Sequence, residues 1–179
     1  GKGVRPNTGF LQGTDVQVNK GIVLGPHLET TAAGVYAAGD AVETDDILLG
    51  QKAVHALWPV AVEQARCAAQ NMVGQETWYP GDVFRNILTV FGLTVFTGGE
   101  STRDEGDVYR DTSDGQYRKI LVRNGRLRGY VFVGEGVNNP GVYLRMMKEQ
   151  TDISSLLRPV LQGTVSSADL YPSVFRAAL

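Results

Sequence analysis

A glycine and an acidic residue follow a short apolar run in the first half of the chain. Residues 35–38 (VYAA) are typical of a strand covered on both faces, and Gly39 and Asp40 come directly after them. In open α/β sheets, ligands bind outside the carboxyl ends of the strands. A carboxylate there accepts hydrogen bonds from sugar or polyol hydroxyls, and a glycine lets a ligand approach the backbone. An Asp40 that caps a turn through its own backbone explains the residues equally well.

A helix is predicted downstream, over residues 58–73. Pro59 suits its first turn, where a missing N–H costs nothing, and Gly74 is a natural stop. The N–H groups of its first turn can point at an electron-rich group on a ligand. Four residues spaced i, i+4, i+7 and i+11 form a predicted buried stripe: Ala61, Ala65, Ala68 and Met72.

The rest of the first region is predicted from its turns. Strand-like runs at 16–18 and 22–24 flank a turn and predict a small hairpin. Residues 42–52 (VETDDILLGQK) are expected to be a loop. Residues 74–82 (GQETWYPGD) contain two glycines and a proline, and we place the boundary between two regions there.

The second region predicts an antiparallel sheet of four or five strands. Asn124-Gly125 is the strongest hairpin signal, Asp114-Gly115 is a second turn, and Gly92 separates two short strands. A helix is expected from Asn139 to Gln150, a short helix near residues 153–157 capped by Asp152, and an amphipathic segment over residues 168–179 that Pro172 interrupts. The apolar side of the helix at 139–150 is predicted to comprise Val142, Leu144, Met146 and Met147.

Composition limits the function classes. A formal net charge of −2 over 179 residues gives no electrostatic reason to expect nucleic acid or an anionic membrane as a partner. The longest mostly apolar run, residues 53–62, is too short to cross a bilayer. Cys67 is the single cysteine, which rules out an internal disulfide and fits a reducing compartment, the cytoplasm. The opening GKGVRPNTGF suggests either a piece cut from a longer chain or a trimmed tag.

Three motifs together resemble one family. TTAAGVYAAGDA (residues 30–41) resembles the second FAD-binding motif of the FAD-dependent pyridine nucleotide–disulfide oxidoreductases. GVRPNT (residues 3–8) resembles the segment where that family's chain re-enters the FAD domain, and WPVAVEQARCAAQNMVG (residues 58–74) resembles the helix after the Asp motif. RNILTVFGL and GRLRGYVFVGE, within residues 80–179, more loosely resemble the C-terminal domain of the rubredoxin reductase and nitrite reductase branch.

The resemblance implies a fold of α/β plus α+β type. Residues 1–76 would be the C-terminal segment of a Rossmann-like FAD-binding domain, and residues 80–179 an antiparallel-sheet-and-helix domain for an interface or dimerisation. The resemblance also assigns FAD-binding roles. Asp40 would bind the ribityl chain, with Gly39 and Ala41 in the same turn, and the backbone of Trp58 and Pro59 would face the pyrimidine end of the flavin ring. No catalytic residue and no metal ligand is assigned.

The resemblance implies a longer parent enzyme. Such enzymes hold FAD and NAD(P)H with two Gly-x-Gly-x-x-Gly loops, and this sequence contains neither loop. Gly98-Gly99 and residues 134–136 (GEG) have the wrong spacing. We therefore expect a C-terminal fragment of an FAD-dependent NAD(P)H oxidoreductase, inactive alone. The alternative is a non-catalytic module that forms a homodimer or docks a redox protein.

Five other side chains are also candidates for a functional role. Cys67 could be a redox nucleophile, but a small buried core residue is the better interpretation. His55 could handle a proton near the flavin or simply pack in a loop. The pair Asp45-Asp46 lacks further ligands for a metal and is typical of a solvated loop, and His27 is expected to face solvent.

Overall fold

The computed structural model describes residues 3–134 and 139–171. Its contacts divide the chain into two compact units, Gly1–Asp82 and Val83–Leu179. Each unit is described by itself.

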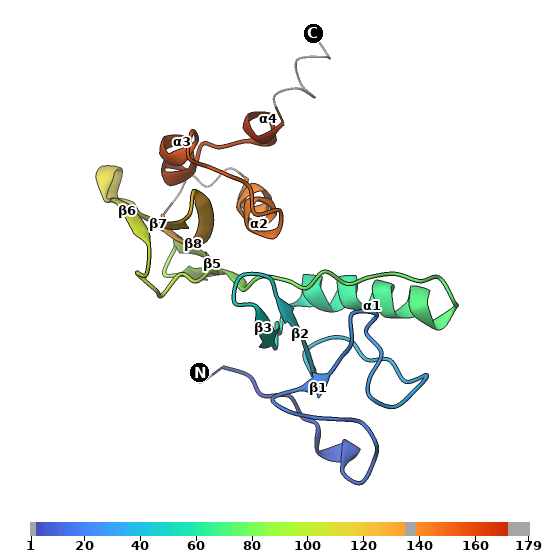
Figure 1. Cartoon of the computed structure of the whole chain (residues 1–179). Helices are drawn as coiled ribbons and strands as arrows, with labels where there is room; N and C mark the ends of the chain where they lie inside the picture. Colours follow the sequence, from blue (N-terminus) through green and yellow to red (C-terminus); the bar gives the residue numbers. More distant parts are fainter. Residues whose placement is uncertain (1–2, 135–138, 172–179) are drawn as a thin grey trace. The chain divides into compact units, whose positions relative to one another are not determined.

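Unit 1 combines a small sheet with one long helix (Figure 1). After the short 3-10 helix η1 (Gly9–Leu11) come β1 (Ile22–Val23), β2 (Val42–Asp46), β3 (Gln51–Ala53) and α1 (Trp58–Met72). The sheet has the order β1-β2-β3, with β1 parallel to β2 and β2 antiparallel to β3. A parallel pair beside a helix is the local arrangement of an α/β domain.

The strand prediction in unit 1 was wrong by several residues. The run at 35–38 is not a strand: Tyr36 makes one isolated bridge to Glu29, and Val35 is 45% exposed. The expected loop at 42–52 instead contains β2, a turn and β3. The three acidic residues of β2 made it look like a solvated loop in the sequence, but two of them, Glu43 and Asp46, are buried in polar contacts. The hairpin expected at 16–24 is reduced to one bridge between Val18 and Ile22.

The helix α1 begins and ends where predicted, within one residue, but buries a different face. Ala65 and Met72 of the predicted stripe are exposed. The buried positions are Val60, Gln64, Cys67 and Ala68. Cys67 and Ala68 join a cluster with the apolar residues of β1, β2 and the following segments: Ile22, Leu24, Leu28, Val42 and Tyr79. Cys67 is therefore a core residue, as its preferred interpretation predicted.

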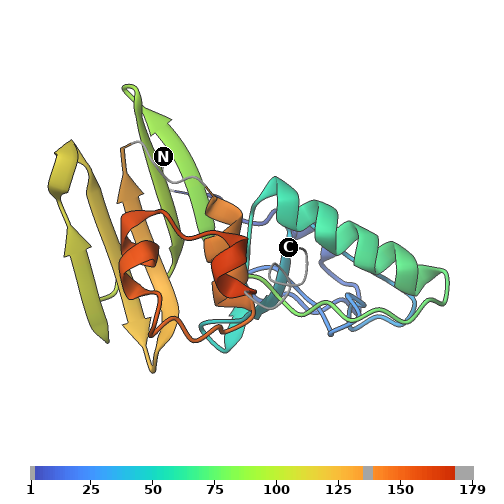
Figure 2. The same ribbon diagram turned by 90° about the horizontal axis from the view of Figure 1, so that it is seen from above.

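Unit 2 is a five-stranded antiparallel sheet with helices on one face (Figure 2). Its strands are β4 (Arg85–Val90), β5 (Leu93–Gly99), β6 (Asp107–Asp111), β7 (Tyr117–Arg123) and β8 (Arg126–Val133), in the order β4-β5-β8-β7-β6. A 3-10 turn, η2 (Ser113–Gly115), precedes β7, and α2 (Pro140–Lys148), α3 (Leu157–Gln162) and α4 (Ser167–Leu170) follow β8. The antiparallel sheet with helices confirms the predicted fold class.

The predicted turns of unit 2 are confirmed. Asn124 and Gly125 have φ values of 53° and 71°, which a type I′ turn requires at both central residues. Phe91 and Gly92 have φ values of 50° and 79° and join β4 to β5 in the same way. Asp114 also has a positive φ, at the turn before β7.

An aromatic cluster packs α2 on the sheet. Tyr143 is fully buried, and its ring lies 5.2 Å from the rings of both Tyr130 and Phe132. Its hydroxyl donates to the carbonyl of Val160 in α3, at 2.7 Å. Gly98 stands opposite Tyr130, where an added Cβ would lie only 2.4 Å from a ring carbon. The tyrosine therefore occupies the space that a side chain at position 98 would need.

A β-bulge redirects one arginine in β8. Leu121 pairs with Gly129 but Val122 pairs with Leu127, so Arg128 is the extra residue. Its guanidinium lies 2.6 Å from the buried carboxylate of Glu100. Arg103 and Arg123 contact the same carboxylate. The bulge thus keeps Leu127 on the core face while Arg128 joins a charge cluster.

The helices of unit 2 differ from prediction in part. Val142, Met146 and Met147 of the expected apolar side of α2 are buried and Tyr143 joins them, whereas Leu144 is only partly buried. The helix expected near residues 153–157 is wrong: Asp152 accepts a hydrogen bond from the Ser154 N–H in a turn, and the helix begins at Leu157. Most of the amphipathic segment predicted at 168–179 lies outside the described residues.

Candidate functional site

The predicted ligand-binding turn is built around Gly39. Its φ is +92°, a conformation that favours glycine, and its carbonyl accepts from the Val42 N–H at 3.2 Å. The bond closes a β-turn with Asp40 and Ala41 at its centre. Asp40 is exposed, whereas the Ala41 carbonyl accepts from the Ile22 N–H at 2.8 Å. The carboxylate therefore stands at a fixed turn beside the point where β1 meets β2.

The same turn lies against the first half of α1. The Gly39 N–H donates to Oε1 of Gln64 at 2.8 Å. A Cβ at position 39 would lie 3.7 Å from the Cβ of Ala61, an ordinary contact, so φ rather than space requires the glycine. The structure thus brings the predicted turn and the predicted helix together.

The start of α1 is open to a ligand. Leu57 is the N-cap residue in an extended conformation and makes no side-chain capping hydrogen bond. Pro59 lies in the first turn, and Trp58 is 81% exposed. The N-terminal end of a helix carries a partial positive charge that stabilises an anion or an electron-rich group. An exposed carboxylate and an uncapped helix start can bind opposite ends of an elongated polar ligand.

A buried hydrogen-bonded pair, Asp46 and His55, lies just before this helix. Nε2 of His55 donates to Oδ2 of Asp46 at 3.0 Å, and both side chains are buried. Oδ1 of Asp46 accepts from the N–H groups of Leu48 and Leu49. Burial raises the pKa of Asp46, but the hydrogen bonds from His55 and the Leu49 N–H outweigh it and hold the pKa below its usual value.

This pair changes two interpretations from the sequence. Asp46 is not in a solvated loop: it ends β2 and is held by three hydrogen bonds. His55 is buried and its carbonyl accepts from the Leu57 N–H at 2.8 Å, which favours the packing role. In the part of the chain that the structure describes, no three His, Cys, Asp or Glu side chains are grouped to hold a metal.

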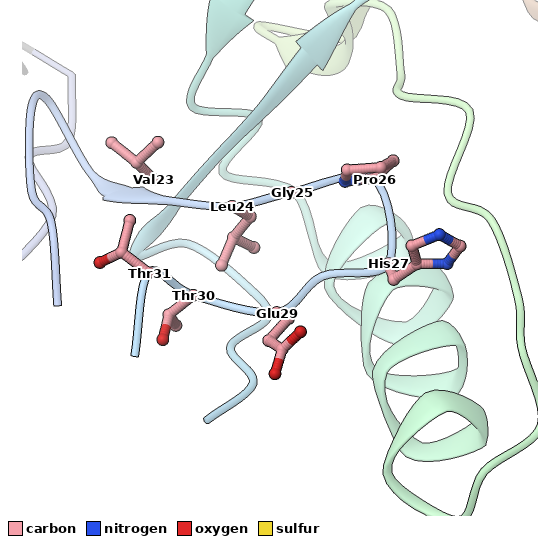
Figure 3. Close-up of a pocket in the computed structure, with 8 residues that line it drawn as sticks. All are labelled: Val23, Leu24, Gly25, Pro26, His27, Glu29, Thr30 and Thr31. Atoms are coloured by element: carbon pink, nitrogen blue, oxygen red, sulfur yellow. The ribbon is translucent and has the colours of Figure 1, made fainter. Parts of the chain in front are cut away.

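Unit 1 also has a hollow, shown in Figure 3. It is lined by one stretch of chain, from Val23 to Thr31. Its polar groups already have partners: Glu29 accepts from the Gly34 N–H, and Thr31 bonds the backbone of Asp15 and Gln17. None of the predicted binding residues lines it, and we assign it no ligand.

His27, at the same hollow, is only half exposed. Its Nδ1 lies 3.0 Å from the Thr77 carbonyl, and its ring meets Trp78 edge-on. The prediction that it faces solvent was therefore wrong in part.

Sequence reasoning missed Gln64 and the pairing of Asp46 with His55. Gln64 was visible as a polar residue at helical spacing from Val60 and Ala68, on the face that the structure buries. No local pattern joins Asp46 to His55, because the β2–β3 hairpin brings them together.

Comparisons with known proteins agree with this organisation. Residues 85–151 match the family model described as Rubredoxin NAD+ reductase C-terminal domain. The chain is 32% identical over 174 residues to the nitrite reductase [NAD(P)H] of Bacillus subtilis, covering 92% of this chain and 21% of that protein.

Two solved structures share the fold. A FAD-dependent pyridine nucleotide-disulphide oxidoreductase from Desulfovibrio vulgaris matches with a TM-score of 0.76 at 16% identity, over 98% of this chain and 47% of that chain. NADH:rubredoxin oxidoreductase from Clostridium acetobutylicum matches with a TM-score of 0.68 at 22% identity, over 89% and 41%.

The fold, the motif order and these relatives define a class: the chain corresponds to the C-terminal part of a pyridine nucleotide–disulfide oxidoreductase. Within that class, residues 85–151 carry the C-terminal domain of the rubredoxin reductase branch. The chain spans about a fifth of its nitrite reductase relative and under half of each solved chain. No helix among the described residues has the length and apolar character needed to cross a membrane.

Proposed function

We propose that residues 1–82 supply one half of an FAD site in a longer NAD(P)H oxidoreductase. Asp40 accepts hydrogen bonds from the ribityl hydroxyls, and Gly39 and Ala41 complete the turn that carries it. The single observation behind the proposal is the 2.8 Å bond from the Gly39 N–H to Gln64 of α1. This bond ties the Asp40 turn to α1, the helix whose positive end we propose to face the flavin ring.

The residues present fit such a cofactor. An exposed carboxylate only accepts hydrogen bonds, which suits a polyol chain. The backbone of Trp58 and Pro59 faces the pyrimidine end of the flavin ring, where the helix dipole stabilises negative charge. When bound, FAD would take a hydride from NAD(P)H and pass the electrons on. The chain's own part is to hold and orient the cofactor.

The other half of the site and the NAD(P)H site lie in residues outside this chain. We therefore propose that residues 1–179 alone are inactive and do not retain FAD. Titration of this chain with FAD, followed by flavin fluorescence, tests the point. Binding at micromolar concentration would show that no further segment is needed.

The decisive variant is Asp40→Ala in the full-length protein. A hydrogen bond to a charged group contributes about 1.5–3 kcal/mol, so the Kd for FAD should rise roughly 10- to 100-fold. Asp45→Ala removes another exposed carboxylate of unit 1 and is the control, with an unchanged Kd. Equal FAD affinity in Asp40→Ala and the wild type would refute the ribityl assignment.

The partners of unit 2 are a separate proposal, either a second copy of the chain or a redox protein. The supporting observation is the β4–β5 hairpin, whose exposed apolar side chains are Ile87, Leu88, Val90, Phe91 and Leu93. Sedimentation of the full-length protein separates the two, because a homodimer forms without any added partner. The cytoplasm remains the expected compartment, on the single cysteine.

A further inference from the structure

One buried amide connects all the parts of the candidate site. Gln64 is 1% exposed on the inner face of α1. Its Oε1 accepts from the Gly39 N–H at 2.8 Å, and its Nε2 donates to Oγ1 of Thr44 at 3.3 Å. A backbone N–H can only donate, so this contact fixes which end of the amide is oxygen.

The two bonds hold different elements. The first anchors the residue that opens the Asp40 turn, and the second reaches β2, where Thr44 is itself buried. The Gly39 carbonyl is bonded to the Val42 N–H at 3.2 Å, so the turn is fixed on both sides of Asp40. The position of an exposed carboxylate is thereby set by a side chain that cannot itself reach a ligand.

We propose that Gln64 is a positioning residue for the cofactor, an inference that rests on the proposed function. It fixes the Asp40 turn relative to the start of α1, and therefore the spacing between the group that binds the polyol chain and the helix end that faces the ring. Without the amide, the Gly39 N–H loses its partner and the turn can move away from the helix. Asp40 would then still be present, but poorly placed.

The test uses the full-length flavoprotein and the substitution Gln64→Met, which keeps the size and removes both hydrogen bonds. We expect the Kd for FAD to rise about tenfold and the visible circular dichroism of the bound flavin to change. Gln70→Met, at an exposed position of the same helix, is the matched control and should change neither. Where Gln64→Met does not fold, Gln64→Glu replaces it. A carboxyl oxygen can still accept from the Gly39 N–H, so an FAD Kd close to that of the wild type is expected, and a Kd as high as that of Asp40→Ala would contradict the positioning role.

A double-mutant cycle separates positioning from general stability. If Gln64 acts through Asp40, Gln64→Met should have little further effect on the FAD Kd in an Asp40→Ala background. Thr44→Val, which leaves the Gly39 bond in place, should lower the melting temperature but change the FAD Kd less than Gln64→Met does. Effects of Gln64→Met and Asp40→Ala that simply add, or an unchanged flavin spectrum in Gln64→Met, would overturn the inference.

The same variants distinguish failure of the Gln64 inference from failure of the proposed FAD site. An Asp40→Ala protein with wild-type FAD affinity contradicts the FAD site itself, and the inference about Gln64 falls with it. Weak binding in Asp40→Ala together with normal binding in Gln64→Met contradicts the positioning role alone.

Discussion

The two units bury their side chains in different ways. Unit 2 forms long paired strands and buries a mainly apolar core under α2 and α3. Unit 1 has strands of two, five and three residues and one helix. Among the described residues, six of the eight buried polar or charged side chains belong to unit 1: Glu43, Thr44, Asp46, His55, Gln64 and Asp82.

The difference predicts that the two units differ in their stability as isolated pieces. A sheet covered by helices can be stable from its own packing. A small sheet with a polar interior and exposed Trp58, Met72 and Val73 has less apolar burial to stabilise it. We infer that unit 1 depends on further chain for stability, as expected of half a binding domain, whereas unit 2 does not.

The largest difference is expected when the two units are expressed separately. Residues 83–179 alone should give a cooperative thermal transition by circular dichroism. Residues 1–82 alone should give none, because their core is small and much of their apolar surface is exposed. A cooperative melt of residues 1–82 would show that the two units do not differ in this way.

Within unit 2, Tyr143→Ala should be the most damaging point substitution. Truncation of a fully buried aromatic residue costs about 3–5 kcal/mol of unfolding free energy, measured by urea denaturation. Tyr143→Phe keeps the ring and loses only the bond to the Val160 carbonyl, so about 1–2 kcal/mol is expected. A loss below about 1 kcal/mol for the alanine variant would mean that the aromatic cluster is not the core of the unit.

Within unit 1, Asp46→Asn should remove a pH-dependent contribution in the full-length protein. The folded pKa of Asp46 is lowered, so its contribution is present above the unfolded pKa of about 3.9 and is lost as pH falls through the lower folded pKa. At pH 7 the variant should lose about 1.5–3 kcal/mol, and the gap to wild type should narrow in acid.

The matched control is Asp45→Asn, an exposed neighbour that contacts Lys52 at 3.4 Å. Such a surface ion pair contributes under about 1 kcal/mol. Denaturation curves at several pH values compare the two variants. A difference in unfolding free energy between the wild type and Asp46→Asn that stays constant as the pH falls below about 4 would contradict the lowered pKa of Asp46.

Alanine substitutions at two glycines of unit 2 should change the stability in opposite directions. Gly98→Ala places a Cβ 2.4 Å from the Tyr130 ring, so a loss of about 1–3 kcal/mol is expected. Gly141→Ala, within α2 and with open space around it, should gain about 0.5–1 kcal/mol from helix propensity. Equal melting temperatures for the two variants would mean that the Tyr130 ring can move away from the added Cβ at no cost in stability.

Sequence patterns predicted unit 2 better than unit 1, for physical reasons. Asn124-Gly125 and Phe91-Gly92 are local turn signals, and the strands that they join pair with their neighbours in sequence. In unit 1, β2 carries three acidic residues that look solvated in a sequence. Two of them, Glu43 and Asp46, are buried, and their burial depends on Asn19, His55 and backbone N–H groups that only the folded chain brings near.

The candidate site, like unit 1, could be predicted from the sequence only in its local parts. The turn at Gly39 and the start of α1 follow from local chemistry, and the structure brings them together. Gln64 was placed in a helix, but its bonds to Gly39 and Thr44 are tertiary and follow from no spacing in the sequence. The cofactor assigned to the turn remains a proposal.

The most direct test of the central claim is a crystal structure of the full-length protein with FAD bound. We predict an Asp40 carboxylate oxygen within about 2.6–3.2 Å of a ribityl hydroxyl, and the flavin ring at the N-terminal end of α1. A flavin bound elsewhere, with Asp40 in contact only with solvent, would contradict the account.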